Sequence, residues 1–311
     1  MNKSNTRVIF FGTPSFAVTV LETLVRDGYN ILAVVTEPDK EFGRKKALAS
    51  SPIKIAAEKH GIPVLQPAKL KNNEAIVREL SSIGADVGVI AAYGKIIPKE
   101  IIDFLEYGIL CIHPSILPNY RGPSPVQTAI LNGDKKMGVT IMKVDEELDH
   151  GSTLGIRKYE LGIKENVKEA TENLFKSGAE LLAEIIPEYI EGKLKPIPQD
   201  HTKATFTKKF TLADGEIKSE DTAEQAHNKV RALNPEPGTY WTLPDGKKLK
   251  IYEADIVSNV ETSDKIGLGV LNKNPVLFLN SGVLFLAKIQ TEGGKPMAGR
   301  EFLNGHKNLF E

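Results

Sequence analysis

Short apolar runs alternate with segments of helical period along the first half of the chain. The first run, RVIFFG at 7–12, is almost continuously apolar, as expected for a strand buried on both faces of a sheet. Thr13 then precedes a proline and a repeat of apolar residues every third or fourth position, which predicts a helix capped by Thr13. Ser51, also followed by proline, begins a second helix in the same way. We predict further strands at 31–35, 64–65, 87–92, 109–113 and 139–144, and further helices at 73–83, 125–131 and 165–190.

This alternation predicts the α/β fold class, with a doubly wound, mostly parallel sheet covered by helices. The pattern changes after residue 190, where EGKLKPIPQD and the residues up to 207 read as an extended linker. Beyond the linker, one predicted helix at 223–233 is followed by predicted strands at 239–242, 248–256, 266–271, 276–279 and 283–290. The predicted organisation is a first domain at 1–190, a linker at 191–207 and a smaller, mainly β, barrel-like domain at 208–311.

Composition narrows the class of protein. The 311 residues include 40 basic and 40 acidic side chains, so the balanced charge argues against a broadly basic nucleic-acid binder but permits a local basic patch. The single cysteine, Cys111, cannot form an intramolecular disulfide, which indicates a reducing compartment. No apolar run is long enough for a membrane span, and no secretory leader is evident. We therefore expect a cytoplasmic monomer with no membrane association.

Candidate chemistry gathers where the predicted strands end. In open parallel sheets, ligands bind beyond the carboxyl ends of the strands. His113 ends one strand, and the acidic loop 145–151 follows another, so the Asp149 carboxylate could orient the imidazole. His113 alone could equally be a structural histidine, and His150 beside Asp149 is too little for a metal site. The dinucleotide-binding, Walker A and G-x-S-x-G sequences are all missing. From the residues alone, the chain is an α/β enzyme whose reaction stays open.

Two motifs connect these strand ends with a known family. HPSILP at 113–118, followed by YRG, resembles the N-x-H-x-S-L-L-P-x-x-R-G motif of the 10-formyltetrahydrofolate-dependent formyltransferases. The acidic loop resembles the D-x-x-x-D-x-G loop of this family, with Asp149 at the place of its catalytic aspartate. The resemblance extends over the whole length of the chain, through the segments FGTPSFAV, AAYGKIIP, KVRALNPEPGTY and GREFLNGH. This full-length pattern is similar to the members that formylate methionine on initiator tRNA, whereas glycinamide ribonucleotide formyltransferases would end near the linker.

The resemblance implies a reaction and a set of site residues. The formyl group would pass from N10 of 10-formyltetrahydrofolate to the α-amine of initiator methionyl-tRNA, with no metal. His113 would support the oxyanion, and Asp149 would orient His113 and help to move protons. The residues implied for folate binding are Ser115, Ile116, Leu117 and Pro118, and those implied for tRNA binding are Lys40, Arg44, Lys45 and Lys46.

Cys111 departs from the family motif, which has an asparagine two residues before the histidine. The family asparagine donates a hydrogen bond to the formyl oxygen as its charge develops, whereas a thiol is a weaker donor on a shorter side chain. Losing one such donor can cost roughly 10²–10³ in turnover. We therefore expect Cys111 to occupy the third catalytic position and to slow the reaction, unless His113 or a water compensates.

Two alternative functions remain open at this point. One is a sugar-amine N-formyltransferase, which shares the catalytic motifs, although the basic segment at 40–46 and the NPEPG sequence favour tRNA. The other is a catalytically impaired relative that binds folate or tRNA, for which Cys111 is the only support.

Overall fold

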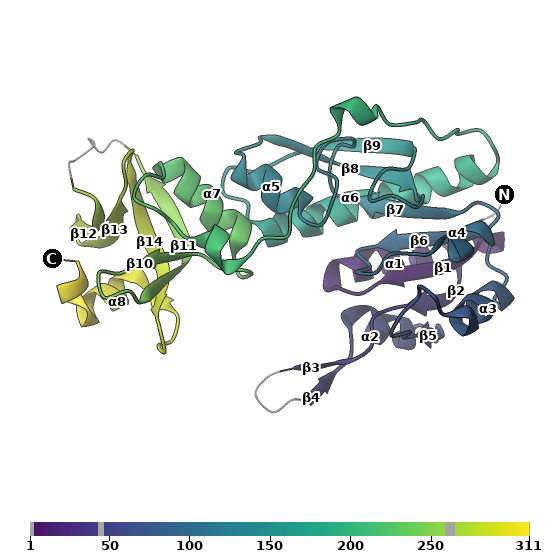
Figure 1. The fold of residues 1–311 in the computed structure, drawn as a ribbon, viewed down its shortest axis with the longest axis horizontal. Helices are drawn as coiled ribbons and strands as arrows, with labels where there is room; N and C mark the ends of the chain where they lie inside the picture. The colour runs from purple at the N-terminus through teal and green to yellow at the C-terminus, as the bar shows by residue number, and fades with distance from the viewer. Residues whose placement is uncertain (1–2, 43–46, 259–264, 311) are drawn as a thin grey trace. The chain divides into compact units, whose positions relative to one another are not determined.

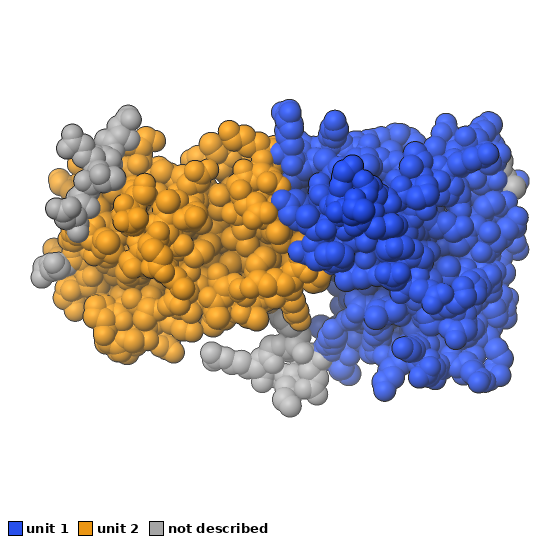
Figure 2. Space-filling model, turned by 45° about the horizontal axis from the view of Figure 1, so that its top comes forward, with its two compact units in different colours: residues 1–122, 136–160, 171–206 blue, residues 123–135, 161–170, 207–311 orange. Residues whose placement is uncertain are grey.

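The chain folds into two compact units in the computed structural model, which describes residues 3–42, 47–258 and 265–310. The first unit comprises residues 1–122, 136–160 and 171–206, and the second unit comprises residues 123–135, 161–170 and 207–311 (Figure 2). Residues 191–206 are thus grouped with the first unit. The domain limits at 190 and 208 stay a prediction.

The first unit is built on a seven-stranded sheet in the order β5-β2-β1-β6-β7-β8-β9. Its strands are β1 (Arg7–Gly12), β2 (Asn30–Val35), β5 (Val64–Leu65), β6 (Val87–Ala91), β7 (Ile109–His113), β8 (Lys136–Lys143) and β9 (Thr153–Glu160). The pairs from β5 to β7 are parallel, whereas β7–β8 and β8–β9 are antiparallel. Strand order reverses between β1 and β6, and in open parallel sheets ligands bind beyond the carboxyl ends of the strands at such a point. This mostly parallel sheet confirms the predicted α/β fold class.

Helices cover both faces of this sheet (Figure 1). They are α1 (Ser15–Arg26), α2 (Pro52–Lys59), α3 (Glu74–Ser82), α4 (Lys99–Asp103) and most of α6 (Val167–Ile190). A β-carbon at Gly178 of α6 would lie 2.6 Å from Ile112 of β7, so the helix backbone rests directly on the strand. On the opposite face, Ile109 packs in one cluster with Ile76 of α3 and Ile101 of α4. Both faces of β7 are therefore buried, as its continuous apolar sequence requires.

The structure corrects some local expectations. Helix α1 begins at Ser15, and Pro14 occupies the capping position in an extended conformation, so Thr13 does not cap the helix. The Thr13 hydroxyl accepts a long hydrogen bond from Thr36 instead. Ser51 caps α2 as predicted, because its hydroxyl accepts a hydrogen bond from the Lys54 amide. The edge strand β9 is an element that the sequence analysis missed.

The second unit contains an antiparallel sheet in the order β10-β11-β14-β13-β12, with β15 paired to β14. Its strands are β10 (Tyr240–Thr242), β11 (Lys248–Val257), β12 (Gly267–Leu271), β13 (Asn274–Phe278), β14 (Val283–Thr291) and β15 (Met297–Ala298). Helices α7 (Ala223–Leu233) and α8 (Gly299–Gly305) bury Val230 and Phe302 in its apolar core. Helix α5 (Pro125–Leu131) packs against α7. This unit confirms the smaller, mainly β part of the predicted fold.

Candidate active site

Strand β7 carries two of the predicted catalytic residues toward the carboxyl end of the sheet. Side chains two apart on a strand share one face, so Cys111 and His113 project on the same side of the sheet. The strand is held by β6 on one edge and by β8 on the other, with His113 opposite Thr140. His113 is buried, with 5% of its surface exposed. Its ring therefore has a fixed position against which a substrate can be oriented.

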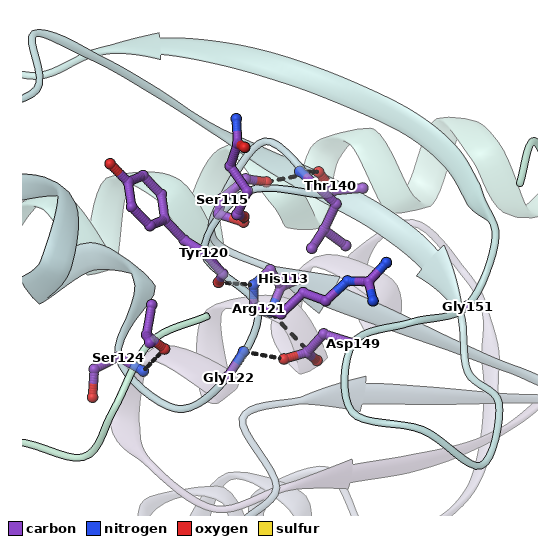
Figure 3. A network of polar contacts seen from close by, with 12 residues as sticks. His113, Ser115, Tyr120, Arg121, Gly122, Ser124, Thr140, Asp149 and Gly151 are labelled. Carbon is purple, nitrogen blue, oxygen red and sulfur yellow. Dashed lines mark hydrogen bonds and ion pairs between the residues drawn. The ribbon is translucent and has the colours of Figure 1, made fainter. Parts of the chain in front are cut away.

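Both ring nitrogens of His113 face oxygen atoms (Figure 3). Nε2 lies 3.0 Å from the Tyr120 carbonyl oxygen, and Nδ1 lies 3.6 Å from Oδ1 of Asp149. A carbonyl only accepts hydrogen bonds, so Nε2 carries a hydrogen in this arrangement. The separation from Asp149 is longer than a hydrogen bond, so the two side chains are neighbours without a direct hydrogen bond. The structure thus brings His113 and Asp149 together as predicted, although β8 is antiparallel to β7 and its carboxyl end lies at the other end of the strand pair.

The backbone around Asp149 fixes the direction of its carboxylate. Asp149 has a φ of 49°, in the left-handed region that non-glycine residues rarely adopt. Its Oδ2 accepts a hydrogen bond of 2.7 Å from the Gly122 amide, in the loop that follows His113. Two residues on, Gly151 lies so close to the chain that a β-carbon would sit 1.8 Å from the Lys143 carbonyl oxygen. The loop can adopt this path only with glycine at that position.

Cys111 is half-buried and packs against the same apolar cluster as Ile90 of the neighbouring strand. Burial raises the pKa of the Cys111 thiol, and the negative charge of Asp149 raises it further. At neutral pH the side chain is therefore an uncharged thiol that retains its hydrogen. A thiolate here would repel a developing oxyanion, whereas the thiol can donate a weak hydrogen bond to it.

The residues predicted to bind folate form the loop after β7. Ser115 and Leu117 are buried, and Ile116 and Pro118 are half-buried. The loop is anchored to β8 through Thr140, whose hydroxyl donates to the Ser115 carbonyl at 2.6 Å and accepts from the Leu117 amide at 3.1 Å. The Ser115 hydroxyl donates to the Asn119 carbonyl. These contacts fix the loop from within the protein. Contact between its residues and folate stays a prediction.

Of the residues predicted to bind tRNA, only Lys40 is among those that the structure describes. It lies in β3 (Lys40–Phe42), which pairs with β4 (Ala47–Ala49), and its ammonium forms an ion pair with Glu37. Arg44, Lys45 and Lys46 lie outside the described residues. Their role stays a prediction.

The sequence analysis missed two residues that support this site. Thr140 lies within a predicted strand, and nothing in its sequence context shows that its hydroxyl holds a loop. Gln199 lies in the predicted linker, yet its buried side chain contacts the loop that carries Asp149. Neither belongs to a motif with known chemistry, so only the three-dimensional arrangement identifies them.

Two kinds of feature are absent from the described part of the chain. In it, no three histidine, cysteine, aspartate or glutamate side chains are grouped so that they could hold a metal ion. Among the same residues, no helix has the length and apolar character needed to cross a membrane.

Comparison with known proteins identifies similar chains. The family model described as "Formyl transferase" matches residues 6–186, and that described as "Formyl transferase, C-terminal domain" matches residues 209–307. The methionyl-tRNA formyltransferase of Lactobacillus acidophilus is 40% identical over 307 residues, which cover 98% of this chain and 97% of the relative.

Two solved structures share the fold at low sequence identity. HypX from Aquifex aeolicus, in complex with tetrahydrofolic acid, has a TM-score of 0.68 and 17% identity, covering 99% of this chain and 49% of that protein. The N-formyltransferase from Helicobacter canadensis, in complex with folinic acid and dTDP-3-aminofucose, has a TM-score of 0.67 and 16% identity, covering 92% of this chain and all of that protein.

Proposed function

The chain belongs to the formyl transferase family, and on this premise we propose that it formylates the α-amine of methionine on initiator tRNA. The observation that carries the proposal is the 40% identity to a methionyl-tRNA formyltransferase over 98% of the chain. This similarity includes the second unit as well as the first. The proposed formyl donor is 10-formyltetrahydrofolate, used as a co-substrate, and no metal takes part.

The proposed reaction is an acyl transfer between two nitrogens. The neutral amine of the methionyl ester attacks the formyl carbon, forming the new carbon–nitrogen bond and moving the carbonyl electrons onto oxygen. The tetrahedral intermediate then collapses as the bond to N10 breaks. The proton lost by the attacking amine offsets the one gained by N10. Such a step needs an oxyanion stabiliser, a route for this proton and a positioned donor.

We assign these roles to the residues at the ends of β7 and β8. His113 is proposed to donate to the developing oxyanion through the hydrogen on Nε2, which would pass from the Tyr120 carbonyl to the formyl oxygen when the substrates bind. Asp149 is proposed to orient His113 and to accept or pass the proton through water, because its carboxylate lies 3.6 Å from Nδ1. Cys111 is proposed as a second, weaker oxyanion donor, supported by the raised pKa that keeps its thiol protonated.

Binding of the two substrates is proposed as in the sequence analysis. The loop from Ser115 to Pro118, held by Thr140, would line the folate site. Lys40 and the basic residues at 44–46 would contact phosphates of the tRNA acceptor end, for which positive charge is suited. Because initiator tRNA is charged and used in the cytoplasm, we propose that the enzyme acts there, as a monomer.

A substrate comparison tests this proposal. Purified protein is mixed with 10-formyltetrahydrofolate and either methionyl-tRNA or an amino-sugar nucleotide, and N-formyl product is measured. We expect product with methionyl-tRNA only. Formylation of the sugar alone would overturn the proposed acceptor, and binding of folate and tRNA without product would favour the impaired relative.

A further inference from the structure

The Gln199 side chain is fully engaged beneath the loop that carries Asp149. Its Nε2 donates to the carbonyl oxygens of Asp149, at 3.0 Å, and of Gly151, at 2.7 Å. Its Oε1 accepts from Nε of Arg121, at 3.2 Å, and from Nη2, at 2.7 Å. A glutamine amide has two donor hydrogens and one oxygen with two lone pairs, so every position is used. With 7% of its surface exposed, Gln199 cannot replace these bonds with water.

These bonds hold the two loops of the site in one arrangement. The carbonyls of Asp149 and Gly151 point to the same amide group, which fixes the backbone on both sides of the residue between them. Asp149 has a strained positive φ, and such a conformation persists only where the surroundings determine it. Arg121, on the other side of the amide, directly follows Tyr120, whose carbonyl contacts the His113 ring. Gln199 therefore connects the segments that orient His113 and Asp149.

The segment that carries Gln199 is itself fixed to the first unit. The backbones of Ile197 and Thr153 exchange two hydrogen bonds of 2.8 Å, next to the Asp149 loop. Six residues beyond Gln199, the Thr205 carbonyl accepts from the Arg121 amide at 2.8 Å, and its hydroxyl accepts from the Tyr120 amide at 2.8 Å. Gln199 therefore lies in a segment that is held on both sides by hydrogen bonds to the first unit.

We infer that Gln199 is a positioning residue for formyl transfer, which holds the Asp149 loop so that its carboxylate faces His113. The inference rests on the proposed role of Asp149 and adds a group that does not touch the substrates. Misplacing a reacting group by about 1 Å can cost roughly 10²-fold in rate. Loss of the Gln199 bonds should therefore reduce kcat about 10- to 100-fold, with KM for both substrates within about threefold of the wild type.

Two substitutions separate positioning from packing. Gln199→Met keeps a similar volume and removes all four bonds. Gln199→Glu keeps an oxygen for Arg121 but turns a second oxygen, instead of the amide hydrogens, toward the two carbonyls. Gln290→Met is the matched control, because Gln290 of the second unit also donates to a backbone carbonyl, that of Gly294. Activity is measured well below the unfolding temperature of each variant, and if Gln199→Met does not fold, Gln199→Glu carries the test.

A double-mutant cycle with Asp149→Asn supplies a readout that a general loss of stability would not move. If Gln199 acts through Asp149, Gln199→Met should change kcat less than about twofold in the Asp149→Asn background. Wild-type kcat in both Gln199 variants, or losses that multiply with Asp149→Asn, would overturn the inference alone. A wild-type rate for Asp149→Asn would overturn the proposed role of Asp149 and the inference with it.

Discussion

Replacing Cys111 by asparagine should increase the rate of formyl transfer. The thiol is protonated at neutral pH because burial and Asp149 raise its pKa, so the present enzyme already has a weak donor at this position. A full oxyanion donor contributes roughly 10²–10³ in turnover, and a thiol supplies part of that. Because β7 places position 111 on the same face as His113, we expect Cys111→Asn to raise kcat about 10- to 100-fold.

The same substitution should cost stability. Cys111 packs against Ile90 and a largely apolar cluster, where a longer polar side chain overpacks the site at a cost of about 1–3 kcal/mol. The added amide also lacks its oxyanion partner when no substrate is bound. We expect the unfolding temperature to fall by several degrees while kcat rises, and thermal unfolding together with single-turnover formylation of methionyl-tRNA measures both.

A graded series at position 111 controls this experiment. Cys111→Ala removes the donor and should slow the single-turnover rate several-fold, whereas Cys111→Ser offers a stronger donor of similar size and should raise the rate. Unchanged rates in all three variants, each correctly folded, would refute the reasoning, because they would show that the side chain at 111 does not reach the reacting oxygen.

Three further results are expected. His113→Ala and Asp149→Asn should each lower kcat by about 10²–10⁴ in steady-state formylation assays, and wild-type rates in both would remove their assigned roles. Replacing the three basic residues at 44–46 by alanine should raise KM for methionyl-tRNA and weaken its salt dependence while leaving folate affinity unchanged, and equal losses for both substrates would count against tRNA contact there. Because the pKa of the Cys111 thiol is raised in the folded protein, the thiol ionises at lower pH in the unfolded chain. The stability that this difference provides is fully present below the unfolded pKa of about 8.5 and is lost as the pH rises above it. In thermal unfolding, the unfolding temperature of Cys111→Ala should therefore fall less between pH ~7 and ~10 than that of the wild type.

The sequence analysis correctly predicted that His113 and Asp149 lie close together, but the reason it gave holds only in part. The rule for open sheets assumes parallel strands. Strand β8 is antiparallel to β7, with Lys143 opposite Leu110, so the two carboxyl ends lie at opposite ends of this pair. The meeting of the two side chains therefore depends on the path of the loop that carries Asp149, which the sequence pattern does not specify. The antiparallel edge was harder to predict. Half-buried and exposed positions alternate along most of the edge strand β9, and Leu154 is its one buried residue, so its sequence resembles a surface loop.

The supporting residues could not be predicted for a different reason. Gln199 is 50 residues from Asp149 along the chain, in a proline-containing segment that resembles a linker. Its role depends on hydrogen bonds to two backbone carbonyls. Every residue has a backbone carbonyl, so the sequence does not show which of them a side chain contacts. Thr140 is similar, because a threonine on a buried strand equally fits a purely β-forming role.

The two units are interleaved along the chain, which limits where the chain can be divided. Residues 123–135 and 161–170 belong to the second unit although they lie between strands and helices of the first. Arg231 of α7 donates to the carbonyls of Gly162 and Glu165, and α5 buries Val126 and Ile130. If the chain were cut at residue 207, the carbonyls of Gly162 and Glu165 would lose the Arg231 guanidinium. Helix α5 would lose α7, against which it packs. The carboxyl-terminal part therefore cannot be exchanged as a self-contained module without compensating changes in residues 123–135 and 161–170.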